Sequence, residues 1–410
     1  MDSTVKDRTK IEQKYTWNLS DLYPTQQDWD KELQGIILDV DKLSECKGKL
    51  GQSAETLAGC LAERFDILKR FYKAHAYASR LFHLDLGNSE AQEVFSRVSK
   101  LGTKVEAAMS FVEPEILLIP KETLDGYKKL PAMKDYLRFL HDVTRRRAHI
   151  RNPEVEEVIA QTGNMASAVS QSYQSLSTVS VPYPEVELSD GRKVTVDQAG
   201  YSRLRALGNR ADRLKVFQAF WHVWQTFKDT YANLLAGKVS VDNYYATTHG
   251  YAGDLEASLD ATDVPTDLYR NMIKQVRAGL PTLWKYLDLR KEMLGLDQLA
   301  YHDLYTSIVP NASFEYGYED GTGLILDALK PLGKDYGKVL KGAFDNRWVD
   351  VYPTKGKRTG AYSSGSAYGI HPFILLNYAD DYNSMSTTAH EFGHAMHSYY
   401  SNQTQPFAQA

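Results

Sequence analysis

The amino-acid sequence predicts a mainly α-helical protein with a small β element towards its C-terminal end. Apolar residues recur at helical spacing through most of the 410 residues, beginning with Trp29, Leu33 and Ile36. The alternation that is typical of strands is confined to two short regions, one around Asp190-Gly191 and one after Trp348. We therefore expect a multi-helix fold with little sheet.

The first half of the chain contains most of the predicted helices. Helical spacing predicts them over residues 26–47, 54–87, 89–112, 121–149 and 152–178. A break at Glu113-Pro114 ends the first three. We interpret residues 1–112 as an N-terminal helical lobe, and residues 113–200 as a helical segment with a β-hairpin.

The hairpin is predicted by its turn. Val186-Glu187-Leu188 and Val194-Thr195-Val196 flank Asp190-Gly191, a dipeptide that favours tight hairpin turns. Helical spacing then resumes, and short strands are expected on both sides of a glycine-rich stretch. The predicted helices cover 210–248, 265–294 and 318–343, and the strands lie in 348–353 and 371–378. Residues 201–410 form the third predicted domain.

Composition excludes several classes of function. The net charge of −4 gives no general attraction to nucleic acid or to an anionic membrane, and neither is expected as a partner. The N-terminal residues have no apolar signal region, and no run is long enough to span a membrane, so we expect a cytoplasmic protein. Cys46 and Cys60 have neither CxxC spacing nor a second pair, which predicts no disulfide framework and no cysteine zinc site.

The sequence His390-Glu391-Phe392-Gly393-His394 is an HExxH motif. Residues four apart lie on one helix face, so the imidazoles of His390 and His394 can bind one metal ion. Glu391 can then act as general base for water that zinc activates. Apolar residues at helical spacing around the motif predict that the opposite face is buried: Met385, Ala389, Phe392, Met396 and Tyr399.

Other interpretations of these residues stay open. His390 and His394 could be unrelated histidines on a helix face. His397 lies on the same face but one turn further along, so we expect a supporting or packing histidine rather than a ligand. The glycine-rich stretch 360–369 lacks the GK[ST] ending of a phosphate loop, and a flexible wall beside a peptide-binding cleft suits it better. A strand near Ile374 or Tyr362 could pair with a peptide backbone, or could be structural.

The chain resembles oligoendopeptidase F, within the thimet oligopeptidase family of zinc peptidases. The resemblance extends over most of the chain. Its most specific parts are YTWNLSDLYP, the hairpin, residues 328–369, ILLNY and TAHEFGHAMHSYYS. It implies a clam-like fold whose two lobes enclose a deep central cleft, with the zinc helix lining the cleft and the small β element close to it.

The resemblance also implies a function and a set of site residues. His390 and His394 would bind one Zn2+ per complete enzyme, and Glu391 would be the general base of an endopeptidase that cleaves short, unstructured oligopeptides. Residues 201–410 would be the catalytic domain, incomplete at its C-terminus, because such enzymes take a glutamate further along the chain as third zinc ligand. A C-terminal fragment of the same protein is therefore an expected partner. Without it, apolar surface around Phe407 and Tyr399-Tyr400 would be partly exposed.

The alternative is a truncated, non-catalytic peptide-binding helical protein with an incomplete metal site. A helical scaffold in which the HExxH motif has no role is also open. Bound zinc, at one equivalent per chain, would favour the peptidase over both.

Overall fold

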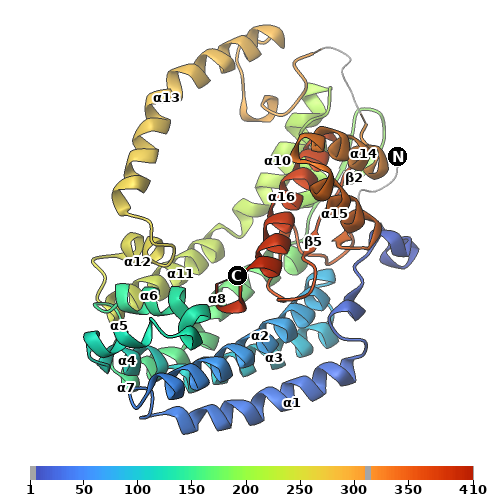
Figure 1. Ribbon diagram of the computed structural model, residues 1–410. Coiled ribbons are helices and arrows are strands. Elements are labelled where there is room, and N and C mark those ends of the chain that lie inside the picture. Colours follow the sequence, from blue (N-terminus) through green and yellow to red (C-terminus); the bar gives the residue numbers. More distant parts are fainter. Residues whose placement is uncertain (1–5, 310–314, 410) are drawn as a thin grey trace. The chain divides into compact units, whose positions relative to one another are not determined.

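The computed structural model describes residues 6–309 and 315–409 (Figure 1). Contacts divide the described residues into two compact units. The smaller unit comprises residues 180–309, 315–317 and 379–383, and the larger comprises residues 6–179, 318–378 and 384–409. The three domains predicted from the sequence stay a prediction, because compactness does not test them.

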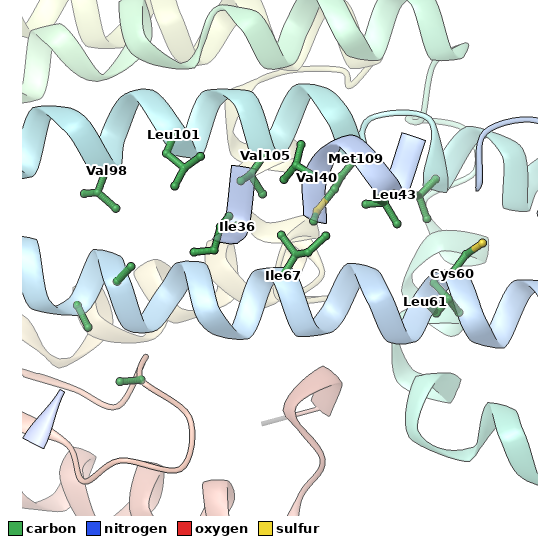
Figure 2. Close-up of a cluster of buried hydrophobic side chains, with 14 of the residues drawn as sticks. Ile36, Val40, Leu43, Cys60, Leu61, Ile67, Val98, Leu101, Val105 and Met109 are labelled. Atoms are coloured by element: carbon green, nitrogen blue, oxygen red, sulfur yellow. The ribbon is translucent and has the colours of Figure 1, made fainter. Parts of the chain in front are cut away.

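The larger unit is built on three long helices. They are α1 (Gln26–Leu43), α2 (Ala54–Leu84) and α3 (Ser89–Met109), and they pack against one another. Figure 2 shows Ile36 of α1, Ile67 of α2 and Val105 of α3 within their shared apolar core. The three predicted N-terminal helices are therefore confirmed.

Polar caps explain where these three helices begin. The side chains of Thr25, Ser53 and Asn88 each accept a hydrogen bond from the backbone N–H three residues further on. Such N-caps satisfy donors that the first helical turn would otherwise leave unpaired.

A disulfide joins the end of the first helical segment to the second. Cys46 lies in the 3-10 turn Ser44–Cys46, which follows α1. It is bonded to Cys60 of α2, and the two Cα atoms are 6.0 Å apart. The spacing of the two cysteines did not predict this bond. Its reason is tertiary: the chain reverses between α1 and α2, which brings together two cysteines 14 residues apart.

Shorter helices complete the larger unit's N-terminal part. They are α4 (Val112–Leu118), α5 (Lys121–Tyr127), α6 (Leu137–Arg145), α7 (Pro153–Gln161) and α8 (Gly163–Ser175). The break predicted at Glu113-Pro114 lies a few residues too far along the chain, because α3 ends at Met109 and Pro114 lies in the first turn of α4, where its missing N–H has no partner to lose. The single helix predicted over 121–149 is interrupted by a 3-10 helix that begins at Pro131.

The smaller unit contains the hairpin and five helices. Strands β1 (Glu185–Glu187) and β2 (Lys193–Thr195) are antiparallel, with Val186 opposite Val194, which confirms the predicted hairpin. The helices are α9 (Gln198–Leu204), α10 (Arg210–Thr226), α11 (Lys228–His249), α12 (Asp254–Asp260) and α13 (Thr266–Met293). The helix predicted over 210–248 is two helices, α10 and α11, while that over 265–294 corresponds to α13.

A three-stranded sheet lies in the C-terminal part of the larger unit. Its order is β3 (Val349–Asp350), β5 (Phe373–Leu375), β4 (Tyr362–Ser364), with β5 parallel to β3 and antiparallel to β4. The helices here are α14 (Tyr318–Ala328), α15 (Lys334–Asp345) and α16 (Tyr382–Thr404). The two predicted strands are confirmed as β3 and β5, and β4 is an additional strand inside the glycine-rich stretch.

The mainly α class, with a small β element, is thus confirmed. The clam-like shape and the deep central cleft stay predictions. Within the described ranges, no helix is both long enough and apolar enough to cross a membrane.

Candidate metal site

Helix α16 holds the HExxH motif and is anchored by its apolar face. Phe392 and Ala395 are fully buried, and Met396 is 1% exposed. The ring centre of Phe392 lies 4.2 Å from the ring centre of Phe344 on α15. Met385, Ala389 and Tyr399 pack against the same core. The predicted amphipathic pattern is therefore confirmed, and one side of α16 is fixed to the larger unit.

His390 and His394 lie on the other side of the helix. Both side chains are exposed, and their Nε2 atoms are 3.1 Å apart. Two imidazole nitrogens that each lie 2.0–2.1 Å from one tetrahedral zinc ion are separated by about 3.3 Å. The two histidines therefore fit one shared zinc ion without a large change of the helix.

Glu391 and His397 are placed differently from each other. Glu391 is 8% exposed, next to the exposed histidine pair. His397, one turn beyond His394, is exposed, so a packing role is wrong, while the expected supporting role stays a prediction. Its seven-residue step from His390 keeps it on the histidine face without burying it.

The described residues offer two metal ligands at this site and not three. Among residues 6–309 and 315–409, no group of three or more His, Cys, Asp or Glu side chains is placed to hold a metal ion. Zinc in proteins normally takes at least three protein ligands. The expectation that the third ligand is a glutamate beyond Ala410 stays a prediction.

The glycine-rich stretch is tied to the second half of α16. Asn402 Nδ2 donates to the carbonyl oxygen of Gly365 at 3.2 Å, and the Tyr368 hydroxyl donates to that of Gln405 at 2.6 Å. A Cβ at Gly365 would lie 2.4 Å from Ser398 Cβ, so only glycine allows this approach. These contacts do not support a flexible wall, because a strand and α16 hold the stretch.

Strand β4 is one of the two edge strands of the three-stranded sheet. Its three residues are half-buried, whereas those of β5 are fully buried. Because β5 has β3 on one side and β4 on the other, the backbone near Ile374 cannot accept another strand. Of the two predicted peptide-pairing segments, only the one at Tyr362 has a free edge within the described part of the chain.

A half-buried network holds β4 in place. Arg358 Nη1 donates to His83 Nε2 at 3.2 Å, so Nδ1 carries the ring proton and donates to the Tyr362 hydroxyl at 2.8 Å. Burial, with the charges of Arg358 and Arg80, lowers the pKa of His83 to about 3. Burial raises the pKa of Tyr362 to about 12. Both groups are therefore neutral near pH 7.

Sequence reasoning missed His83 and Arg358. His83 lies near the end of α2, 279 residues from Tyr362, and no local pattern marks it. Arg358 lies in the segment KGKRTGAY, where its charge indicates only a solvent-exposed loop. Only the folded chain shows that the last turn of α2 brings His83 next to Tyr362 of β4.

The C-terminal residues do not leave Phe407 free. Its ring lies 6.3 Å from Phe65 of α2 and 5.6 Å from Tyr368. The ring centre of Tyr399 lies 5.6 Å from that of Trp348, and the ring centre of Tyr400 lies 6.4 Å from that of Tyr336. Both tyrosines are half-buried. The expected apolar surface around Phe407 is therefore largely covered, because the chain after α16 turns back onto α2.

Two protein-family models match the chain. Residues 203–409 match Peptidase family M3, and residues 115–182 match the model described as Oligopeptidase F. The first match includes the whole of α16.

Curated relatives and a solved structure are also similar. Oligopeptidase PepF of Bacillus subtilis is 34% identical over 98% of this chain and 60% of its own length. An oligoendopeptidase F homolog of Lactococcus lactis is 31% identical over 98% of this chain and 67% of its own length. The crystal structure of oligoendopeptidase-F from Enterococcus faecium has a TM-score of 0.70 and 26% identity, over 78% of this chain and 60% of that one. The chain thus spans 60% of the length of the Bacillus subtilis relative.

Proposed function

Because the chain belongs to peptidase family M3, we propose that it serves in a zinc-dependent endopeptidase that hydrolyses short, unstructured oligopeptides. The histidine pair of α16 carries this proposal, since its Nε2 atoms are 3.1 Å apart on an exposed helix face. The names of the relatives, an oligopeptidase and an oligoendopeptidase F homolog, support oligopeptides as the substrate class.

His390 and His394 would bind one zinc ion through Nε2. When bound there, zinc would supply the Lewis acidity that polarises a scissile carbonyl and makes water a stronger nucleophile at neutral pH. The two imidazoles are carried by a helix whose other face is buried, so the backbone that positions them is fixed before any metal arrives.

Glu391 would move the proton. Its carboxylate would accept a proton from the attacking water and then return it to the departing amine, so that the peptide bond breaks as the new carboxyl group forms. The residue follows His390 directly on α16, which fixes its distance from the ligand pair. It would act as a base and not as a ligand.

Strand β4 would bind the substrate backbone. Its outer edge has no strand partner among the described residues, so an extended peptide could add there as a further strand. Only a chain segment free of its own secondary structure can pair in this way. This supports selection for unstructured oligopeptides over folded proteins.

The remaining zinc ligand would come from outside the described residues. We propose that it lies in the part of the family fold that this chain does not match, as expected for a C-terminal fragment of the same protein. With two histidines alone, the described chain would bind zinc weakly and would be catalytically silent. A cytoplasmic location, with neither nucleic acid nor membrane as partner, remains part of the proposal.

A non-catalytic peptide-binding protein is the second candidate. The observation that favours it is the ligand count, two histidines rather than three ligands. Such a protein would use β4 to bind peptides and would need no metal. Peptide binding that is equal with and without zinc, and with no cleavage in any combination, would select it.

Measurement of zinc content and peptide cleavage tests the proposal. The chain would be assayed alone and after co-expression with the unmatched part of the Bacillus subtilis relative, with a quenched fluorescent decapeptide and a native globular protein as substrates. We expect chelator-sensitive cleavage of the peptide only in the co-expressed sample. Glu391→Gln should keep the zinc and lose nearly all turnover, whereas His394→Ala should lose both. Zinc-independent cleavage, or full turnover by Glu391→Gln, would refute the assignment.

A further inference from the structure

Helix α13 has a continuous apolar face. Leu268, Met272, Val276, Leu283 and Tyr286 fall within about 80° of one another around the axis, at 100° per residue. We call these five residues the α13 stripe. Charged residues occupy the opposite side: Arg270, Lys274, Lys285, Asp288 and Glu292. In a globular protein such an amphipathic pattern marks a helix that packs through its apolar face.

The α13 stripe is exposed. Its side chains are 58%, 53%, 63%, 48% and 46% exposed, in the order of the chain. The buried residue of α13 is instead a charged one, Arg290, which donates to the carbonyl oxygens of Asp303 and Thr306. The helix is thus held at its C-terminal end, while the side chains of the α13 stripe stay about half exposed among the described residues, over a length of about 27 Å from Leu268 to Tyr286.

Exposure on this scale is unusual for a soluble surface. Single exposed apolar residues are normal, but a continuous row on one helix marks a contact surface. Tyr269, 38% exposed, and Met293, 46% exposed, border the row and widen it. Aromatic residues and methionine are the types that contribute most to buried protein interfaces.

We infer that the α13 stripe is the docking surface for the part of the M3 fold that this chain does not match. The chain aligns over 98% of its own residues but over 60% of the Bacillus subtilis relative, so the family fold contains further polypeptide that has to pack on the matched part. This inference rests on the proposed function, because the same polypeptide would bring the missing zinc ligand.

The chemistry of α13 favours this partner over two others. A membrane-binding helix carries a mainly basic polar face, whereas here Asp288 and Glu292 are mixed with the basic residues. A second copy of the chain would leave unexplained where the relatives' additional residues pack. A helix or helical hairpin with its own apolar row would cover the α13 stripe along its length.

Co-expression of the chain with the unmatched part of the Bacillus subtilis relative, followed by size-exclusion chromatography, tests the inference. The stripe variant is Met272→Asp with Val276→Asp. The matched control is Lys274→Asp with Ala278→Asp, which also places two aspartates four residues apart, on the opposite exposed side of α13. All four positions are exposed, so both variants should fold, which circular dichroism checks.

We expect a 1:1 complex for the unchanged chain and for the control, and a dissociation constant at least about tenfold higher for the stripe variant. Equal binding by the stripe variant, or no complex for any form, would overturn the inference. So would self-association of the chain alone that the stripe variant abolishes, because a second copy would then be the occupant. Binding of the chain to anionic phosphatidylserine vesicles through the stripe would overturn it as well.

The inference and the proposed function fail separately. A stripe-dependent complex without zinc or peptidase activity would keep the docking surface and remove the proposed function. If the stripe variant formed the complex normally and that complex cleaved peptide in a zinc-dependent way, the proposed function would stand and the docking surface would be refuted.

Discussion

Replacing Asp350 with asparagine should destabilise the protein strongly, because Asp350 holds together a buried ion cluster. Its carboxylate accepts hydrogen bonds from Arg8 at 2.7 and 3.2 Å and lies 2.7 Å from Lys357 Nζ. The side chains of Asp350 and Lys357 are 1% and 0% exposed. Asp350 belongs to β3, so this cluster ties the N-terminal segment to the sheet that includes β4.

The expected magnitude follows from the burial. Asparagine keeps the size of the side chain but leaves the Lys357 ammonium buried without a counter-charge. Removing one partner of a buried pair costs about 3–5 kcal/mol in the free energy of unfolding. Lys357 also donates to the carbonyl oxygens of Asp350 and Tyr352, which keeps it from turning out to solvent.

Urea unfolding, followed by circular dichroism at pH 7, measures this loss. The matched control is Asp345→Asn, which breaks a pair with Lys341 at 2.5 Å whose side chains are 58% and 64% exposed. Such a pair contributes at most about 1 kcal/mol. Adding Lys357→Met to Asp350→Asn should recover much of the loss. A loss below about 1 kcal/mol for Asp350→Asn would refute the reasoning.

The same cluster makes the stability depend on pH. Burial raises the pKa of Asp350, but the charges of Lys357 and Arg8 outweigh it and hold the pKa below its ordinary value. The stabilising contribution is therefore complete above the unfolded pKa, about 3.9, and is lost as the pH falls through the lower folded value. The free energy of unfolding of Asp350→Asn should therefore lack this acid-sensitive contribution.

Two further predictions concern groups that the sequence did not mark. Replacing Cys46 and Cys60 with serine should lower the free energy of unfolding by about 3 kcal/mol, because the bond closes a loop of 14 residues. Reducing agent should lower the free energy of unfolding of the unchanged chain to the same level and should leave the variant unaffected. Equal stability of the oxidised and the reduced protein in urea would contradict this. Burial lowers the pKa of His83 to about 3 and of His75 to about 4, so the folded state binds fewer protons than the unfolded one between these values and about 6.5. Stability should therefore be full above pH 6.5 and fall towards pH 4. His83→Gln should weaken this dependence. If the urea midpoint of the variant had the same pH profile as that of the unchanged chain, the lowered pKa of His83 would be contradicted.

Features set by local sequence could be predicted. The buried face of α16 follows from the spacing of Phe392 and Met396, and the hairpin follows from Asp190-Gly191. The spacing of His390 and His394 was enough to predict that two imidazoles meet, because four residues on a helix fix their separation. In each case the partners lie within a few residues of each other.

Features set by distant contacts could not be predicted. Arg8 and Asp350 are 342 positions apart, and nothing in either segment indicates the other. A lysine in the segment TKGKRTG indicates a solvated loop, yet Lys357 is fully buried because Asp350 offsets its charge. Pro114 misled for a related reason: proline ends a helix in the interior but begins one in the first turn, and only the packed chain decides which applies.

The metal site combines both kinds of feature. The ligand pair is local, and it is built before metal binds, because Phe392, Ala395 and Met396 fix α16 to a core that needs no ligand. The third ligand and the cover of the α13 stripe are both non-local, and the described residues provide neither. A preformed pair lowers the ordering cost that a partner must offset when it adds one more ligand. The partner's binding can therefore be driven by the apolar area of α13, while the zinc ion sets the geometry of a site whose first two ligands are already in place.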